Sequence, residues 1–169
     1  MAIALDRIIV PTYLRGLSVL ARYIDKAAAH VAASGLADDA IVQARLAPDM
    51  LTFAGQIQRA SDTAKGGIAR LLGIDAPRFE DNETTLVELK ARIDRTLVFV
   101  ASADRAGIAA AEGREIMLKA GALERRFDGV GYVIDFAVPN FDFHVAVAHA
   151  ILRHAGIAVG KLDYLGATT

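Results

Sequence analysis

The sequence contains no cysteine, and this absence removes several kinds of site at once. Without cysteine the 169-residue chain forms no disulfide, supplies no thiolate to a metal and offers no cysteine nucleophile. It also lacks any apolar run near the roughly 18 residues that a membrane span requires. Its 19 basic and 20 acidic side chains are interspersed and give a net charge of −1, so there is no basic stripe for nucleic acid.

Familiar catalytic motifs are missing as well. There is no G-x-S-x-G nucleophile elbow, no glycine loop before G-K-[ST] and no H-E-x-x-H zinc motif. The N-terminal MAIALDRIIVP is interrupted by an acid and an arginine, which makes it a poor secretory signal. We therefore expect a cytoplasmic protein of bacterial type that binds neither membrane nor nucleic acid. Its length predicts one domain over residues 1–169 with a sizeable core.

Apolar residues recur three and four positions apart in four segments, which is the pattern of amphipathic helices. The segments cover residues 12–33, 48–73, 85–103 and 139–156. A short helical piece is expected at 38–44. Four such helices predict an all-α four-helix bundle.

The ends of the middle helices carry recognisable signals. Pro48 is expected to open the second helix with Asp49 in its first turn, where the helix dipole favours a carboxylate. Thr85 and Glu88 form a T-x-x-E capping box at the start of the third helix, whose buried arc is expected to include Val98.

Three further features of the chain have an ordinary structural interpretation. Asp62 and Lys65 follow the flank of the second helix and are expected to form an intrahelical ion pair at a solvated edge. Gly66-Gly67 is expected to permit close approach of two helices. The tail containing Lys161, Asp163 and Tyr164 is expected to dock the C-terminus onto the bundle.

The fourth helix, from Pro139 to Gly156, carries one inward-facing histidine. Its apolar stripe consists of Phe141, His144, Val145, Ala148, Ile151, Leu152 and Ala155. At about 100° per residue, His149 and His154 fall on either side of this stripe. His144 is therefore expected to point inward, beside Asn140 one turn earlier.

Between residues 113 and 129 the helical period disappears. Ile116 and Leu118 alternate with polar neighbours, and a turn of small residues precedes 123–127, which favours a two-stranded hairpin lying across the helices. Residues 132–138 fit a buried strand or a helix leading into the fourth, and the helix is favoured. The predicted fold is thus a four-helix bundle with a small β-hairpin between its third and fourth helices.

Several short motifs cover nearly the whole chain: LRGL at 14–17, ARLAPDM at 44–50, AKG at 64–66, FED at 79–81, PNF at 139–141, FHV at 143–145, ILRH at 151–154, and the tail from Gly160-Lys161 to Gly166. In combination they resemble an uncharacterised bacterial domain-of-unknown-function family within the DinB-like (YfiT-like) metalloenzyme superfamily. The resemblance implies an up-down-down-up bundle with one long connection, often assembled as a homodimer.

The resemblance also implies a place for a metal site. Members of the superfamily typically hold nickel or zinc with three histidines, one from the second helix and an H-x-x-x-H pair from the start of the fourth. Here that pair corresponds to Asn140-x-x-x-His144, and the second helix has no histidine, so Asp49 is the nearest candidate there. The implied set of Asp49, Asn140 and His144 is a weak one, because zinc sites use three or four nitrogen, sulfur or carboxylate ligands.

Each of these residues has two interpretations. His144 is either a core histidine bonded to Asp49, a tyrosine or a carbonyl, or a pocket residue that acts as ligand or acid/base with Asp49 as its orienting partner. Asn140 is otherwise a helix cap, and Asp49 is otherwise a first-turn acid.

Two hypotheses for function follow. The first is a metal-assisted small-molecule transferase or hydrolase with a degraded metal site, in which His144 and Asp49 are catalytic; its reaction class depends on the resemblance alone. The second is a non-catalytic bundle that binds a small ligand or dimerises and has lost the metal. The cofactor is accordingly nickel, zinc or none, and alanine-rich surfaces favour a homodimer.

Overall fold

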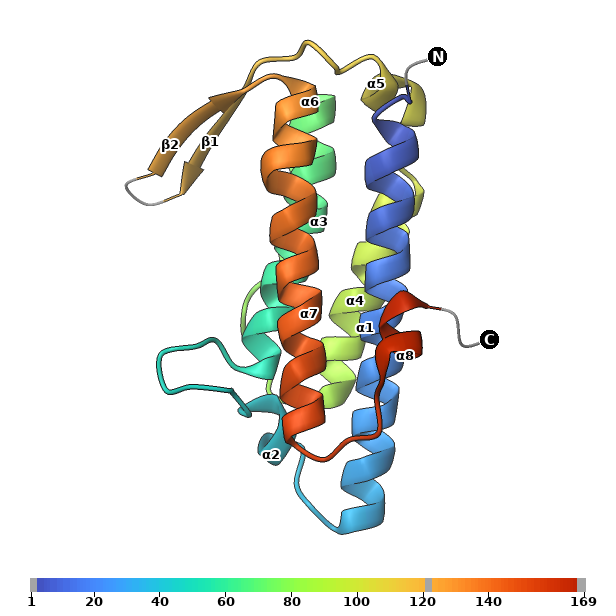
Figure 1. Cartoon of the computed structure of the whole chain (residues 1–169), viewed down its shortest axis with the longest axis vertical. Helices are drawn as coiled ribbons and strands as arrows, with labels where there is room; N and C mark the ends of the chain where they lie inside the picture. The colour runs from blue at the N-terminus through green and yellow to red at the C-terminus, as the bar shows by residue number, and fades with distance from the viewer. Residues whose placement is uncertain (1–2, 121–122, 167–169) are drawn as a thin grey trace.

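Four long helices stand side by side in the computed structural model, which describes residues 3–120 and 123–166 (Figure 1). They are α1 (Asp6–Ser34), α3 (Phe53–Leu72), α4 (Leu86–Ala101) and α7 (Val138–His154). In Figure 1 α1 and α7 run downward, whereas α3 and α4 run upward. Each of α1 and α3 packs against both α4 and α7. Because α3 and α4 run the same way, residues 73–85 must return along the length of the bundle. The predicted mostly helical fold is confirmed.

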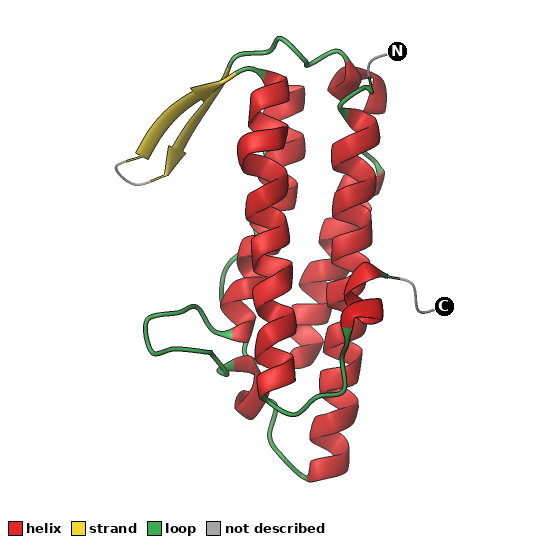
Figure 2. Cartoon of the chain, in the orientation of Figure 1, coloured by secondary structure: helices red, strands yellow, loops and turns green. Residues whose placement is uncertain are grey.

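Shorter elements lie near the two ends of the bundle, except for α8, which lies beside α1 (Figures 1 and 2). They are α2 (Asp39–Val42), α5 (Arg105–Ala109), β1 (Ile116–Ala120), β2 (Leu123–Phe127), α6 (Gly129–Tyr132), a π-helical turn η1 (Val133–Ala137) and α8 (Lys161–Leu165). β1 and β2 form an antiparallel hairpin in which Ile116 is paired with Phe127. Ile116 and Leu118 are buried, so one face of β1 is covered by protein.

The core is built from the apolar stripes of the four long helices. Its largest fully buried apolar side chains include Tyr13, Leu17, Leu20, Tyr23, Ile24, Phe53, Ile57 and Phe141. Two glycines let helices approach closely. A Cβ at Gly16 would lie 2.3 Å from the Phe141 ring, and one at Gly67 would lie 2.5 Å from the Tyr13 hydroxyl oxygen. The expectation that Gly66-Gly67 permits close packing is confirmed for Gly67. Val98, predicted to be buried, is 70% exposed.

The start of α3 differs from the prediction. Thr52, not Pro48, is the N-cap, and its hydroxyl accepts a hydrogen bond from the amide of Gly55 at 3.1 Å. Pro48 and Asp49 lie in a turn outside the helix. A threonine cap satisfies a free amide at the helix start, which proline cannot do. The capping box of Thr85 and Glu88 is confirmed.

α7 does not begin at Pro139, because helix already extends from Gly129 through η1 into α7. A proline inside a helix has no N–H, and its ring crowds the carbonyl four residues earlier. For Pro139 that carbonyl belongs to Asp135, which lies within the wider π turn. The π turn therefore accommodates the proline without breaking the helix. Gly156, with φ of 83°, follows α7 as predicted.

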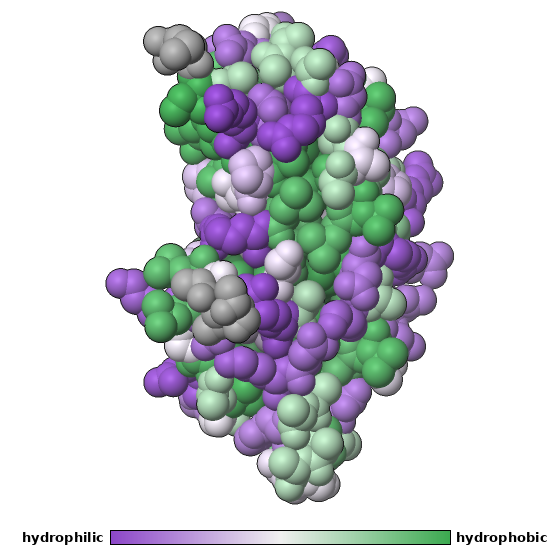
Figure 3. Space-filling model, turned by 90° about the vertical axis from the view of Figure 1, so that its right-hand side faces the viewer, coloured by the Kyte–Doolittle hydropathy of each residue, from purple (hydrophilic) through white to green (hydrophobic). Residues whose placement is uncertain are grey.

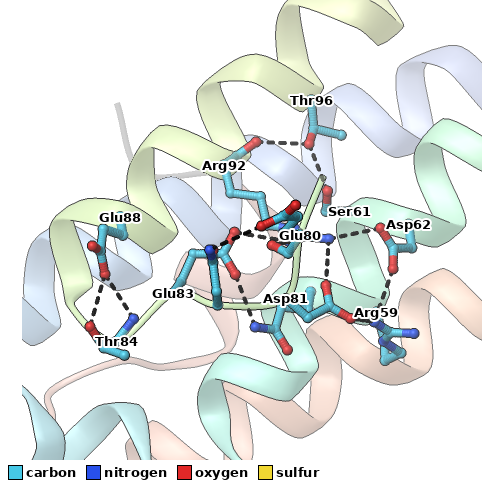
Figure 4. Close-up of polar contacts among 12 residues, drawn as sticks. Arg59, Ser61, Asp62, Glu80, Asp81, Glu83, Thr84, Glu88, Arg92 and Thr96 are labelled. Atoms are coloured by element: carbon cyan, nitrogen blue, oxygen red, sulfur yellow. Dashed lines mark hydrogen bonds and ion pairs between the residues drawn. The ribbon is translucent and has the colours of Figure 1, made fainter. Parts of the chain in front are cut away.

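A buried arginine fastens the 73–85 connection to the bundle (Figure 4). Arg92 on α4 is fully buried, and its guanidinium lies 2.9 Å from Glu83, 2.8 Å from Asp62 and 3.0 Å from Asp81. It also donates to the carbonyl of Glu80. These contacts compensate the buried charge and hold the connection against α3 and α4.

The flank of α3 is covered by this connection instead of being solvated. Lys65 pairs with Asp62 at 3.0 Å, as predicted, but it is only 4% exposed. Its ammonium donates to the carbonyl of Pro77 at 3.0 Å and lies 3.9 Å from the centre of the Phe79 ring. The prediction of a solvated edge is therefore wrong for Lys65, whereas Asp62 is half-buried.

The C-terminal segment docks on α1 and α7, as expected. Lys26 pairs with Asp163 at 2.7 Å, and Arg15 donates to the carbonyl of Tyr164. The Tyr164 ring meets the His149 ring edge-on. His149 is thus engaged here, away from the inward face of α7.

Candidate functional site

His144 occupies the inward face of α7 and makes one defining hydrogen bond. Its Nδ1 lies 2.8 Å from Oε1 of Gln56 on α3. The amide nitrogen of Gln56 donates to the carbonyl of Leu51, which turns the amide oxygen toward the histidine. An amide oxygen only accepts, so Nδ1 of His144 carries the hydrogen and Nε2 carries the lone pair.

The imidazole of His144 is neutral at neutral pH. Burial, reinforced by the positive charge of Arg59, lowers the pKa of His144 from 6.5 to about 4. Among the described residues Nε2 has no hydrogen-bond partner, and it is not among their buried unpaired polar atoms. A neutral, accessible acceptor is therefore available to a ligand.

A pocket of about 400 Å³ lies beside this histidine, between α3, the η1–α7 helix and β1. Its lining consists of Arg59, Asp62, Thr63, Arg70, Leu118, Lys119, Tyr132, Phe136, Asn140 and His144. The volume falls in the range of small-molecule sites.

The helical side of this pocket uses residues spaced by four: Tyr132, Phe136, Asn140 and His144. In an α-helix, side chains four apart drift around the axis by about 40° per step, because a turn takes 3.6 residues. The π turn at η1 is wider and reduces this drift, which keeps Tyr132 and Phe136 in line with His144. π turns often occur at functional sites.

Asn140 also points toward α3. Its amide nitrogen donates to the hydroxyl of Thr63 at 2.8 Å. Asn140 and Thr63 therefore form a second polar bridge between α7 and α3, beside the bridge of His144 and Gln56. Asn140 is not a helix cap, because helix precedes it without interruption.

Asp49 lies apart from the two α7 residues. It is exposed in the turn before α3 and does not line the pocket. The structure thus brings together Asn140 and His144, with Gln56 in the place expected for Asp49. Gln56 carried a usable signal, since it stands three residues after Phe53 and four before Ala60, inside the predicted apolar stripe.

Residues 5–165 match a family described as "Domain of unknown function (DUF1993)". The chain belongs to the DUF1993 family. It is also similar to a solved structure described as a DinB family member protein from Shewanella denitrificans, at 37% identity and a TM-score of 0.88. That similarity covers 97% of this chain and 93% of the other. No curated protein matches the chain.

The pocket of this DUF1993 chain does not fit the three-histidine metal site implied by the resemblance. The described residues contain no group of three His, Cys, Asp or Glu placed to hold a metal. Beside His144 the pocket offers an amide and a hydroxyl that already bond each other. The positive charge of Arg59 near the imidazole also opposes a cation.

The helices carry no sign of a membrane span. Within residues 3–120 and 123–166, none combines the length and apolar character needed for crossing a bilayer.

Proposed function

We propose that this DUF1993 chain binds a small molecule in the pocket between α3, α7 and β1, on an up-down-down-up bundle of the DinB type. The observation that carries the proposal is the neutral imidazole of His144, fixed by Gln56 with its Nε2 lone pair available beside a pocket of about 400 Å³. Asn140 would line the same site. This is the small-ligand-binding hypothesis from the sequence; Asp49, which belonged to the enzyme hypothesis, takes no part in it.

The test is a metabolite screen by thermal shift and ligand-observed NMR, followed by a pair of variants. His144→Ala should weaken binding of a true hit at least tenfold, about 1.4 kcal/mol or more. His154→Ala, on the exposed face of the same helix, should leave the affinity unchanged. Hits that bind both variants like the wild type would remove His144 from the site.

The enzymatic hypothesis from the sequence is tested at the same site. A histidine with a pKa of about 4 is unprotonated at pH 7, but it is a weak base, because general-base catalysis is most effective when the pKa lies near the operating pH. His144 is therefore better suited to accept a hydrogen bond from a bound hydroxyl or thiol at Nε2 than to remove its proton. Mass spectrometry of each hit after incubation should accordingly detect no product, and a product whose formation is lost in His144→Gln would support the enzymatic hypothesis instead.

The homodimer and the cytoplasmic location remain predictions. The face in Figure 3 shows a band of apolar residues between polar margins. Val87 and Val98 on α4 are 76% and 70% exposed. Light scattering across a tenfold range of concentration would measure the mass in solution. A monomer at every concentration would contradict the dimer.

A further inference from the structure

The lining of the His144 pocket has an excess of positive charge. It includes the side chains of Arg59, Arg70 and Lys119 but only one carboxylate, that of Asp62. The chain as a whole is nearly neutral, with a net charge of −1, so this local excess is not a reflection of composition. Its significance depends on which of these charges already have partners.

Asp62 is already neutralised by neighbouring cations. Its carboxylate lies 2.8 Å from the buried Arg92 and 3.0 Å from Arg59 (Figure 4). It also lies 3.0 Å from Lys65. Arg59 is shared between Asp62 and Asp81. These side chains thus satisfy one another, and Asp62 has little negative charge left for the pocket.

Arg70 is different, because among the described residues its guanidinium bonds a neutral group and no carboxylate. Nη1 donates to the hydroxyl of Tyr132 at 3.1 Å. A Cβ at Gly66 would lie 2.5 Å from that same nitrogen, so the glycine leaves room for the arginine to fold back along α3. Arg70 also lines the adjoining hollow of about 480 Å³ between α3 and residues 76–80.

The wall next to Arg70 is aromatic. The rings of Tyr132 and Phe136 are stacked, with centroids 5.9 Å apart and planes 28° apart. Both side chains line the pocket. Tyr132 is buried and Phe136 is half-buried, so a planar apolar group gains contact area against the Phe136 ring, with Tyr132 stacked behind it.

We propose that the ligand is a small aromatic acid, a deepening that rests on the proposed function of the same pocket. Its carboxylate or phosphate pairs with the guanidinium of Arg70, whereas Lys119 on the hairpin already pairs with Glu124 at 3.7 Å. Its ring packs on Phe136, which Tyr132 supports from behind, and a hydroxyl on the ring donates to Nε2 of His144. A guanidinium matches both carboxylate and phosphate geometry, so the shared chemistry is a planar body with one acidic group.

The experiment is an NMR titration with a series of simple probes. 4-Hydroxybenzoate is compared with its neutral amide, 4-hydroxybenzamide, and 4-hydroxyphenyl phosphate separates phosphate from carboxylate. We expect at least one acid to bind at least tenfold more tightly than the amide, with shifts at the amides of α3 and α7 that line the pocket. Arg70→Gln should reduce this ratio below threefold, whereas Arg45→Gln, at an exposed arginine outside the pocket, should preserve it.

The outcomes separate the two proposals. If the amide binds as tightly as the acids and loses affinity in His144→Ala, the pocket is a ligand site but the proposal that its ligand carries an acidic group is wrong. If the acids bind and Arg70→Gln leaves the ratio intact, the role of Arg70 is wrong. If no probe binds while the metabolite screen gives His144-dependent hits, the proposal of an aromatic acid fails and the proposal of a ligand-binding pocket stands. If nothing binds in either experiment, both proposals fail.

Discussion

A hydrogen bond to Gln56 gives His144 its chemical character. The bond fixes the proton on Nδ1, and burial together with Arg59 lowers the pKa to about 4. Sequence could place His144 on the inward stripe, because helical periodicity is a local property. Periodicity also places Gln56 on the inward face of its own helix, but it could not pair Gln56 with His144, because the two lie 88 residues apart in the sequence.

Stability should report this shifted pKa. The unfolded histidine takes up a proton near pH 6.5, whereas the folded one does so only near pH 4, so stability is lost as the pH falls between these values. From pH 7 to pH 5 the wild type should lose about 2 kcal/mol more than His144→Gln. Urea unfolding at the two pH values measures the difference, and other titrating groups cancel in the comparison. Equal losses would mean that His144 titrates normally.

Arg92 is the residue on which the 73–85 connection depends. Arg92→Leu leaves the buried Glu83 without its charged partner, with only the hydrogen bond from Gln58, and should lower the free energy of unfolding by about 3–5 kcal/mol. The matched control is Arg95→Leu one turn away, where an exposed guanidinium lies over Phe79 at 4.3 Å, with an expected cost of about 1 kcal/mol or less. Chemical denaturation measures the free energy of unfolding of both variants. A similar loss in the two would contradict the role of Arg92 in holding the 73–85 connection.

At the scale of elements, the helix boundaries that depend on contacts between helices could not be predicted from local sequence signals. The capping box of α4 and the glycine ends were predictable because each satisfies its own turn. Pro48 and Pro139 were misleading, since proline is compatible with a helix start without specifying one. The π turn before Pro139 has no sequence signature of this kind, and it aligns the pocket-lining side chains.

The close approach of α1 and α7 at Gly16 gives a test of packing. Gly16→Ala would place a methyl group 2.3 Å from the Phe141 ring, and the resulting strain should cost about 1–3 kcal/mol. Gly113→Ala, where a Cβ meets nothing within 4 Å, should change stability by about 0.5 kcal/mol or less. Thermal unfolding of the two variants compares them. If Gly16→Ala is as stable as Gly113→Ala, the helices are farther apart than described.

At the scale of the whole molecule, the described residues form the fold of the family and contain no group of three His, Cys, Asp or Glu placed to hold a metal. Helical periodicity predicted the bundle because every long helix must bury a stripe, whatever its function. The pocket required the hairpin, the π turn and α3 to meet, and these come from distant parts of the chain. Its lining residues could therefore not be assembled from the sequence.

Metal content is the corresponding prediction. Protein purified without an affinity tag or chelator should contain zinc and nickel well below one equivalent, because one imidazole beside an arginine is too weak a donor set. Added zinc should raise the melting temperature no more in the wild type than in His144→Ala. Elemental analysis and thermal shift measure both quantities. A stoichiometric metal that is lost in His144→Ala would restore the metalloenzyme hypothesis.

The most direct measurement of the central claim is a long-range proton–nitrogen NMR spectrum of the histidine rings at pH 7, with His144→Gln used for assignment. The account predicts a neutral His144 with the proton on Nδ1, and a change at Nε2 when a binding ligand is added. An imidazolium at pH 7, a proton on Nε2, or an Nε2 signal that no bound ligand alters would contradict it.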